Sequence, residues 1–328
     1  MHIIRPVWRC SIAHGVFNGC VAEIGMGGME KIPVGQTIRH AYGFAVRNFP
    51  GLVRLLWLPA LLLIGLTVFQ TIALNDLYPK LVVGDHEAIG QSWMILLPYI
   101  IAVLVLTCMM VTGVAQYLLG LRPAPRFGYF SLGKPVWRLS GAFAVIILIL
   151  LMALMVVFVL AIVTAVIVTK VTGTTPQNHP SGTAALMIGV LTLAGIFAAC
   201  LGGLYVLLRQ SFFLAPVINA ERLGLRRAWQ LSKGNFWRIF AVTLVVFAPS
   251  LIFGVLLGST GMTSLGQMSG TVQEVIASKA MAIAKLKDNA FWLVPSYFLL
   301  LVFNYGAIVS AQVFAYRHLM GGIPDEAR

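Results

Sequence analysis

The sequence has few charged residues, and acidic residues are the scarcest. Only 10% of its 328 residues are Asp, Glu, Lys or Arg, whereas soluble domains carry about 25%. So few charged side chains cannot cover a water-facing surface, which excludes an ordinary soluble protein. Ten acidic residues stand against 23 Lys and Arg, and the formal net charge is therefore +13.

The sequence also lacks the common metal-binding and catalytic motifs. Its four cysteines, Cys10, Cys20, Cys108 and Cys200, form no CxxC pair, and its six histidines include no HExxH motif. Neither a disulfide framework nor a metal site is predicted. A GxSxG nucleophile elbow and a phosphate-binding GxxxxGK[ST] loop are both missing. We therefore expect no cofactor, and we predict that the protein is not an enzyme.

Long apolar runs are what the sequence does contain. A helix needs about 20 apolar residues to cross a bilayer, and six runs meet this length: 55–74, 94–119, 142–169, 184–208, 239–257 and 291–314. None of these runs contains Asp, Glu, Lys, Arg or His, which argues against proton-coupled transport and acid–base catalysis inside the membrane. The predicted fold class is an all-α, polytopic membrane protein with six transmembrane helices.

The runs leave no room for a separate soluble domain, so residues 35–328 are predicted to form one membrane domain. Residues 1–34 lack the continuous apolar core of a signal peptide. They are predicted to be a poorly structured tail, and a start at Met26 or Met29 is an alternative to the first methionine.

Basic residues concentrate in alternate connections between the runs. They precede the first run and fill the second and fourth connections, whereas the other three connections hold few cations and half of the acidic residues. Because positively charged loops stay cytoplasmic, we predict a bacterial inner-membrane protein with both termini in the cytoplasm. Cations beside membrane spans fit anionic lipid headgroups as partners and do not indicate nucleic-acid binding.

Two basic segments resemble each other at a constant spacing. Residues 38–42 and 48–49 match residues 225–229 and 235–236, and Trp137-Arg138 before the third run is similar to Trp237-Arg238 before the fifth. This pattern predicts three repeats, each an interfacial helix followed by two spans. Such helices place cations at lipid phosphates. The candidate headgroup-binding residues are Arg226, Arg227, Lys233, Arg238 and Arg138, and a simple topology anchor is the alternative interpretation.

Two further sets of residues are candidates for specific roles. Arg209 and Glu221 flank Pro216 and are predicted to form a structural ion pair that fixes the segment from residue 223 onward. The polar residues Gln116, Asn304 and Gln312 lie inside the apolar runs. They are expected to form hydrogen bonds between helices, with a polar cavity as the alternative.

Residues 208–242 carry a resemblance to a known family. They contain Arg209, the Ala215-Pro216 pair, Glu221 and a basic stretch that ends in Gly234-Asn235-Phe236-Trp237-Arg238. This run resembles the membrane domain associated with glycerophosphoryl diester phosphodiesterases and the related stand-alone six-span bacterial membrane proteins. The resemblance implies the six-span fold. It implies no phosphodiesterase activity, because that activity belongs to a separate barrel domain that we do not find in this sequence.

The function expected from these features is that of a lipid-interacting scaffold or a membrane-homeostasis factor without a catalytic site. The alternative is a permease-like carrier or transporter subunit for an apolar or lipid-like solute. An enzyme that acts on lipid headgroups would have to build its site at the basic cytoplasmic face. The sequence indicates neither a protein partner nor an oligomeric state.

Overall fold

The structure is a computed structural model that describes residues 31–121, 132–171, 182–221, 224–259 and 272–320. The chain divides into two compact units, Met1–Lys31 and Ile32–Arg328, and the fold described below is that of the second unit. The predicted tail falls mainly on residues 1–30, which lie outside the described residues.

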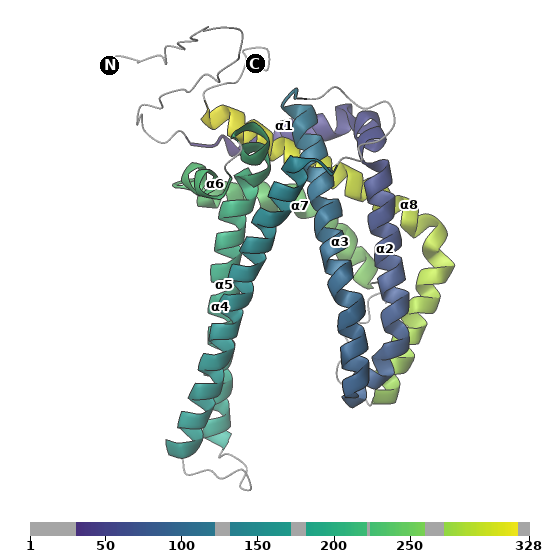
Figure 1. Cartoon of the computed structure of the whole chain (residues 1–328), viewed down its shortest axis with the longest axis vertical. Coiled ribbons are helices and arrows are strands. Elements are labelled where there is room, and N and C mark those ends of the chain that lie inside the picture. The colour runs from purple at the N-terminus through teal and green to yellow at the C-terminus, as the bar shows by residue number, and fades with distance from the viewer. Residues whose placement is uncertain (1–30, 122–131, 172–181, 222–223, 260–271, 321–328) are drawn as a thin grey trace. The chain divides into compact units, whose positions relative to one another are not determined.

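Every regular element in the described residues is an α-helix, as the fold class predicted. Figure 1 shows their arrangement. The helices are α1 (Val34–Arg47), α2 (Phe49–Val83), α3 (His86–Leu118), α4 (Lys134–Val171), α5 (Gly182–Glu221), α6 (Leu225–Ser232), α7 (Phe236–Ser259) and α8 (Val272–Leu319).

Six of these helices are long and apolar enough to cross a membrane, which confirms the predicted number of spans. The candidate spans are Phe49–Asn75, His86–Leu118, Lys134–Thr164, Leu193–Asn219, Phe236–Leu256 and Lys287–Leu319. Each overlaps its predicted run, but the span in α5 extends beyond the predicted end at residue 208 and takes in Arg209. The predicted runs themselves hold no charged residue, but the longer spans also take in charged residues near their ends, among them Arg54, Arg138 and Arg238.

Helices α4 and α5 form an antiparallel pair along which most large apolar side chains of α4 are exposed (Figure 1). A helix that is apolar on all sides suits a lipid environment. Small residues allow the two helices to approach closely, since a Cβ atom at Gly203 would lie 3.2 Å from a methyl carbon of Leu150. Lipid-facing apolar surface and close packing at glycine are both typical of membrane helices.

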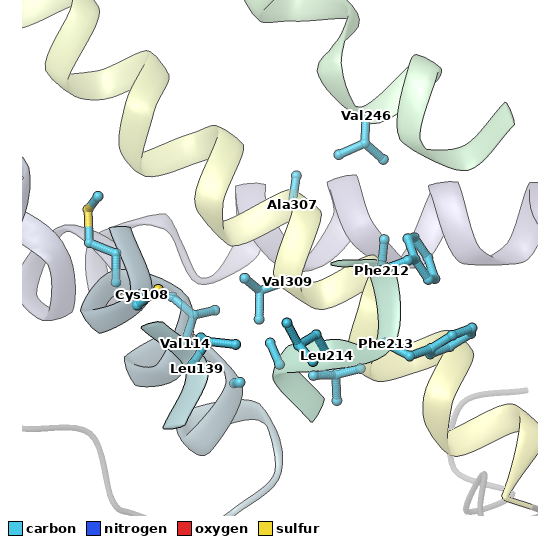
Figure 2. Close-up of a cluster of buried hydrophobic side chains, with 14 of the residues drawn as sticks. Cys108, Val114, Leu139, Phe212, Phe213, Leu214, Val246, Ala307 and Val309 are labelled. Atoms are coloured by element: carbon cyan, nitrogen blue, oxygen red, sulfur yellow. The ribbon is translucent and has the colours of Figure 1, made fainter. Parts of the chain in front are cut away.

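The buried core forms where the basic ends of the helices meet. Figure 2 shows side chains of this cluster, and those that it labels belong to α3, α4, α5, α7 and α8. Val114 of α3 and Leu139 of α4 are fully buried there, together with Phe213 and Leu214 of α5 and Val309 of α8. Dispersion and close packing hold such a cluster together, because lipid chains are as apolar as the side chains themselves.

Helices α3 and α8 run parallel to each other in a constant register. The Tyr305 hydroxyl lies 3.4 Å from the Thr107 hydroxyl, and further along both helices the Arg317 Nη2 donates to the Leu118 carbonyl at 2.8 Å. The last carbonyls of a helix have no partner within it, and they carry partial negative charge. Arg317 therefore caps α3 while it joins the two helices.

The predicted repeat is not confirmed. Short helices precede two spans, since α1 leads into α2 and α6 leads into α7. In the second predicted unit, however, Trp137 and Arg138 lie within the first turns of α4, and α4 is continuous from Lys134 into the span. Three equivalent units of one interfacial helix plus two spans thus stay a prediction.

We predict that Gly306→Ala destabilises the packing of α8 on α2. A Cβ atom at position 306 would clash with the Leu52 Cδ1, and Leu52 is fully buried. Overpacking of this kind costs about 1–3 kcal/mol, so the melting temperature in detergent should fall. In a Leu52→Ala background, which removes the clashing methyl group, Gly306→Ala should cost less than it does in the wild type. Gly254→Ala, which meets no atom within 4 Å, is the control, and equal effects of the two glycine substitutions would contradict the prediction.

Candidate functional site

The short helix α6 and its junction with α7 lie at the basic end of the spans. Ala228 and Ser232 are buried on the face of α6 that packs against α5, whereas Arg226 and Gln230 are exposed. An amphipathic helix with small residues inside and cations outside suits the boundary between a helical bundle and lipid headgroups.

Arg209 of α5 contacts α6 at two points and Tyr205 of its own helix at a third. Its Nε donates to the Ser232 hydroxyl at 3.1 Å, and its Nη1 donates to the Tyr205 hydroxyl at 2.6 Å. The guanidinium carbon lies 3.8 Å from the centre of the Trp229 ring. An Arg can make all three contacts at once because its guanidinium is flat and carries several donors in a fixed fork.

The predicted ion pair of Arg209 with Glu221 stays a prediction, because the Glu221 side chain lies outside the described part of the chain. Sequence reasoning missed the contacts of Arg209 with Trp229 and Ser232. It predicted an amphipathic interfacial helix after residue 223, but it did not anticipate that Trp229 and Ser232 of this helix would contact Arg209 of α5.

The five predicted headgroup residues divide into two groups. Arg226, Lys233 and Arg138 are exposed. Arg227 is partly buried and its Nη2 lies 3.7 Å from the Met320 sulfur, while the Arg238 Nη1 donates to the Ile32 carbonyl at 2.7 Å. The first three are free to meet a headgroup, and the other two also make contacts within the protein.

The backbone just before α1 is held at the junction of α6 and α7. Ile32 is fully buried, its N–H donates to the Asn235 Oδ1 at 3.2 Å, and its carbonyl accepts from Arg238. Asn235 also begins α7, because its carbonyl accepts from the N–H groups of Arg238 and Ile239. Residues more than 200 positions apart are therefore joined at one point, which nothing in the sequence around Ile32 indicated.

Exposed tryptophans accompany the exposed cations. Trp137 is 57% exposed and Trp237 is 75% exposed, and each lies in the first turn of its helix. At the other ends of the spans, Trp93 and Trp292 are exposed as well. The distance along α3 from Trp93 to Leu118 is about 37 Å at 1.5 Å per residue, which matches a hydrocarbon layer of about 30 Å plus part of both interfaces.

The three predicted intramembrane polar residues have different environments. The Gln116 Nε2 donates to the Asn219 Oδ1 at 3.1 Å, which links α3 to α5, and Asn219 in turn donates to the Ala215 carbonyl. Asn304 and Gln312 lie on α8, and their side-chain oxygens are buried without a hydrogen-bond partner among the described residues. The Thr112 hydroxyl is buried in the same way. Asn219 and Thr112 are polar participants that sequence reasoning did not select.

His40 of α1 packs against α8. Its ring stacks on Phe314 with 4.5 Å between the ring centres, and its Nδ1 lies 3.4 Å from the Ser310 hydroxyl. Burial, and then the positive charge of Arg317, lower the pKa of His40. The neutral imidazole is therefore the form that suits the docked α1.

The described part of the chain contains no group of three or more His, Cys, Asp or Glu side chains that could hold a metal ion.

Comparisons with protein-family models, with characterised proteins and with solved structures found no match. The resemblance of residues 208–242 to the phosphodiesterase-associated membrane domain thus stays a prediction.

We predict that Arg209→Lys loosens α6. Lysine keeps the charge but loses the stacking on Trp229 and the forked donation to Ser232 and Tyr205, at a cost of about 0.5–2 kcal/mol. Hydrogen exchange in residues 225–232 should become faster. Arg226→Lys, at an exposed position, is the matched control. Wild-type exchange in Arg209→Lys together with faster exchange in Glu221→Ala would favour the ion pair as the attachment instead.

We predict that acidification weakens the docking of α1. The pKa of His40 is lowered in the folded protein. Below the ordinary value of about 6.5, the unfolded state therefore binds more protons than the folded state does. The stabilisation is complete above that value and is lost as the pH falls through the lowered pKa. The melting temperature should therefore fall as the pH falls across this range. His40→Gln should reduce this pH dependence, whereas the control His86→Gln should leave it unchanged. An unchanged pH dependence in His40→Gln would exclude His40 as its source.

Proposed function

We propose that the protein is a non-enzymatic scaffold of the bacterial inner membrane that gathers anionic lipid headgroups at its basic, cytoplasmic end. The observation that carries the proposal is the pairing of exposed tryptophans with exposed cations. Trp137 precedes Arg138, and Trp237 follows Lys233, at the starts of two spans. Indole rings favour the headgroup level of a bilayer, and cations beside them are placed to meet lipid phosphates.

The distribution of charge supports the same proposal. The exposed cations at the ends of the spans near α1 and α6 are Arg39, Arg47, Arg54, Lys134, Arg138, Arg226 and Lys233. Among the described residues at the opposite ends, four exposed lysines are accompanied by three exposed acidic side chains: Lys80, Lys170, Lys285 and Lys287, with Asp85, Glu87 and Asp288. Since positive segments stay in the cytoplasm, this asymmetry favours cytoplasmic termini and an anionic surface facing the basic end.

The packing of the two short helices supports a scaffold rather than a mobile anchor. α1 buries Thr37, Ala41 and Ala45, and α6 buries Ala228 and Ser232. Both helices keep an arginine on the exposed side. A cation that is held on a docked helix loses less freedom when it binds a phosphate than one on a free tail, so binding at a fixed position is favoured.

A carrier for an apolar or lipid-like solute is the second candidate. It is favoured by the buried oxygens of Thr112, Asn304 and Gln312, which lack a hydrogen-bond partner among the described residues. Buried polar atoms of this kind normally find a partner, and a polar group of a solute could supply one.

We predict that the purified protein retains anionic lipids and that the exposed cations select them. The purified protein is exchanged into detergent micelles that contain equal amounts of phosphatidylglycerol and phosphatidylcholine. Native mass spectrometry should then show more bound phosphatidylglycerol than phosphatidylcholine. The triple substitution Arg138→Gln, Arg226→Gln and Lys233→Gln should reduce the enrichment several-fold, because it removes the attraction to phosphate at about 1 kcal/mol per cation.

The matched control replaces Lys285 and Lys287 with Gln at the opposite ends of the spans, and it should leave the enrichment unchanged. Equal retention of both lipids by the wild type would contradict the scaffold. A single retained neutral solute that depends on Asn304, and not on the three cations, would favour the carrier.

A further inference from the structure

Pro249 leaves a gap in the hydrogen bonding of α7. A proline has no backbone N–H, so the carbonyl four residues earlier loses its partner in the helix. In α7 this carbonyl belongs to Val245, and the helix continues through Pro249 from Phe236 to Ser259. The Val245 carbonyl therefore needs a donor from elsewhere.

The position of Val245 in the helix makes an unpaired carbonyl there especially unfavourable. Val245 lies nine residues after Phe236, which is about 14 Å along the helix and thus inside the hydrocarbon region of a membrane-spanning α7. Lipid chains offer no hydrogen bond, so an unpaired carbonyl there is costly.

Tyr42 of α1 supplies the missing donor. Its hydroxyl donates to the Val245 carbonyl at 2.6 Å, a short bond by the usual standard for O–H donors. The Tyr42 ring stacks on Phe303 of α8, with 5.9 Å between ring centres and 21° between ring planes. One side chain of α1 thus contacts both α7 and α8.

Helix α1 is held at two further points. The backbone of Ile32 is bonded to Asn235 and Arg238 at the start of α7, and His40 stacks on Phe314 of α8. α1 therefore packs against both α7 and α8, although these two helices lie far from it in the sequence.

We propose that α1 is a strap that sets the conformation of α7, because the Tyr42 hydroxyl replaces the backbone hydrogen bond that Pro249 removes. While α1 is docked, α7 is held at Asn235, Arg238 and Val245, and the last of these contacts satisfies the carbonyl that Pro249 leaves open. When α1 is released, the Val245 carbonyl loses its donor, and the part of α7 beyond Pro249 is free to change its bend.

A double-mutant cycle tests the link between the two residues. Tyr42→Phe keeps the ring and removes only the donor, so it should lower the melting temperature in detergent and speed hydrogen exchange in residues 34–47. Pro249→Ala restores an N–H that can bond to the Val245 carbonyl within α7. In the Pro249→Ala background, Tyr42→Phe should therefore have little effect on either measurement.

The control for this cycle is Pro59→Ala, which removes a proline from α2. Tyr42→Phe should have its full effect in that background. Equal losses from Tyr42→Phe with proline or alanine at position 249 would overturn the proposal, because they would assign the role of Tyr42 to ring packing on Phe303. The absence of any effect of Tyr42→Phe in the wild type would overturn it as well.

Spin labels test the predicted motion of α7 directly. In a chain whose native cysteines are replaced, a label at Val255 reports on α7 beyond Pro249, and a label at Leu244 reports on α7 before it. Both side chains are exposed. Tyr42→Phe should raise the mobility of the label at position 255 and leave position 244 unchanged. Unchanged mobility at both positions would show that α1 does not set the conformation of α7.

Discussion

The hydrocarbon interior of a bilayer provides no water to pair with backbone N–H and C=O groups, and this constraint governs the whole fold. A helix satisfies the requirement within itself except at its ends and at prolines. The structure shows what happens at these exceptions. Arg317 donates to the terminal carbonyl of Leu118, and Tyr42 donates to the carbonyl that Pro249 leaves unpaired. Two contacts between distant helices therefore form where a single helix is incomplete.

The same constraint explains why the spans could be predicted from the sequence and why their boundaries were predicted less well, as at the end of the fourth run. Length and hydropathy identify a helix that must cross about 30 Å of hydrocarbon, and all six predicted runs overlap a candidate span. A count of apolar residues stops at the first charge, and for this reason the fourth run ended before Arg209. In the structure, Trp229, Tyr205 and Ser232 surround that guanidinium, so the apolar segment continues past it.

Long-range contacts were beyond the reach of sequence patterns. The bond from Ile32 to Asn235 and the bond from Tyr42 to Val245 each join residues 203 positions apart, and no local periodicity encodes such a pairing. The internal similarity held a partial signal. Ala41 and Ala228 occupy matching positions in the similar segments, and both are fully buried. The match thus indicated which face of each short helix packs inward, but not which span receives it.

The basic residues of this protein have two different roles, which the composition of the sequence does not distinguish. Arg209, Arg238 and Arg317 hold helices or backbone together through directed hydrogen bonds, whereas Arg138, Arg226 and Lys233 are exposed. In the sequence, both groups belong to one positive pattern that predicts cytoplasmic placement. Only the second group bears on lipid recognition, because neutralising a cation of the first group would also loosen the bundle. A role in headgroup binding therefore has to be argued from exposed cations on packed helices, and net charge alone is not enough.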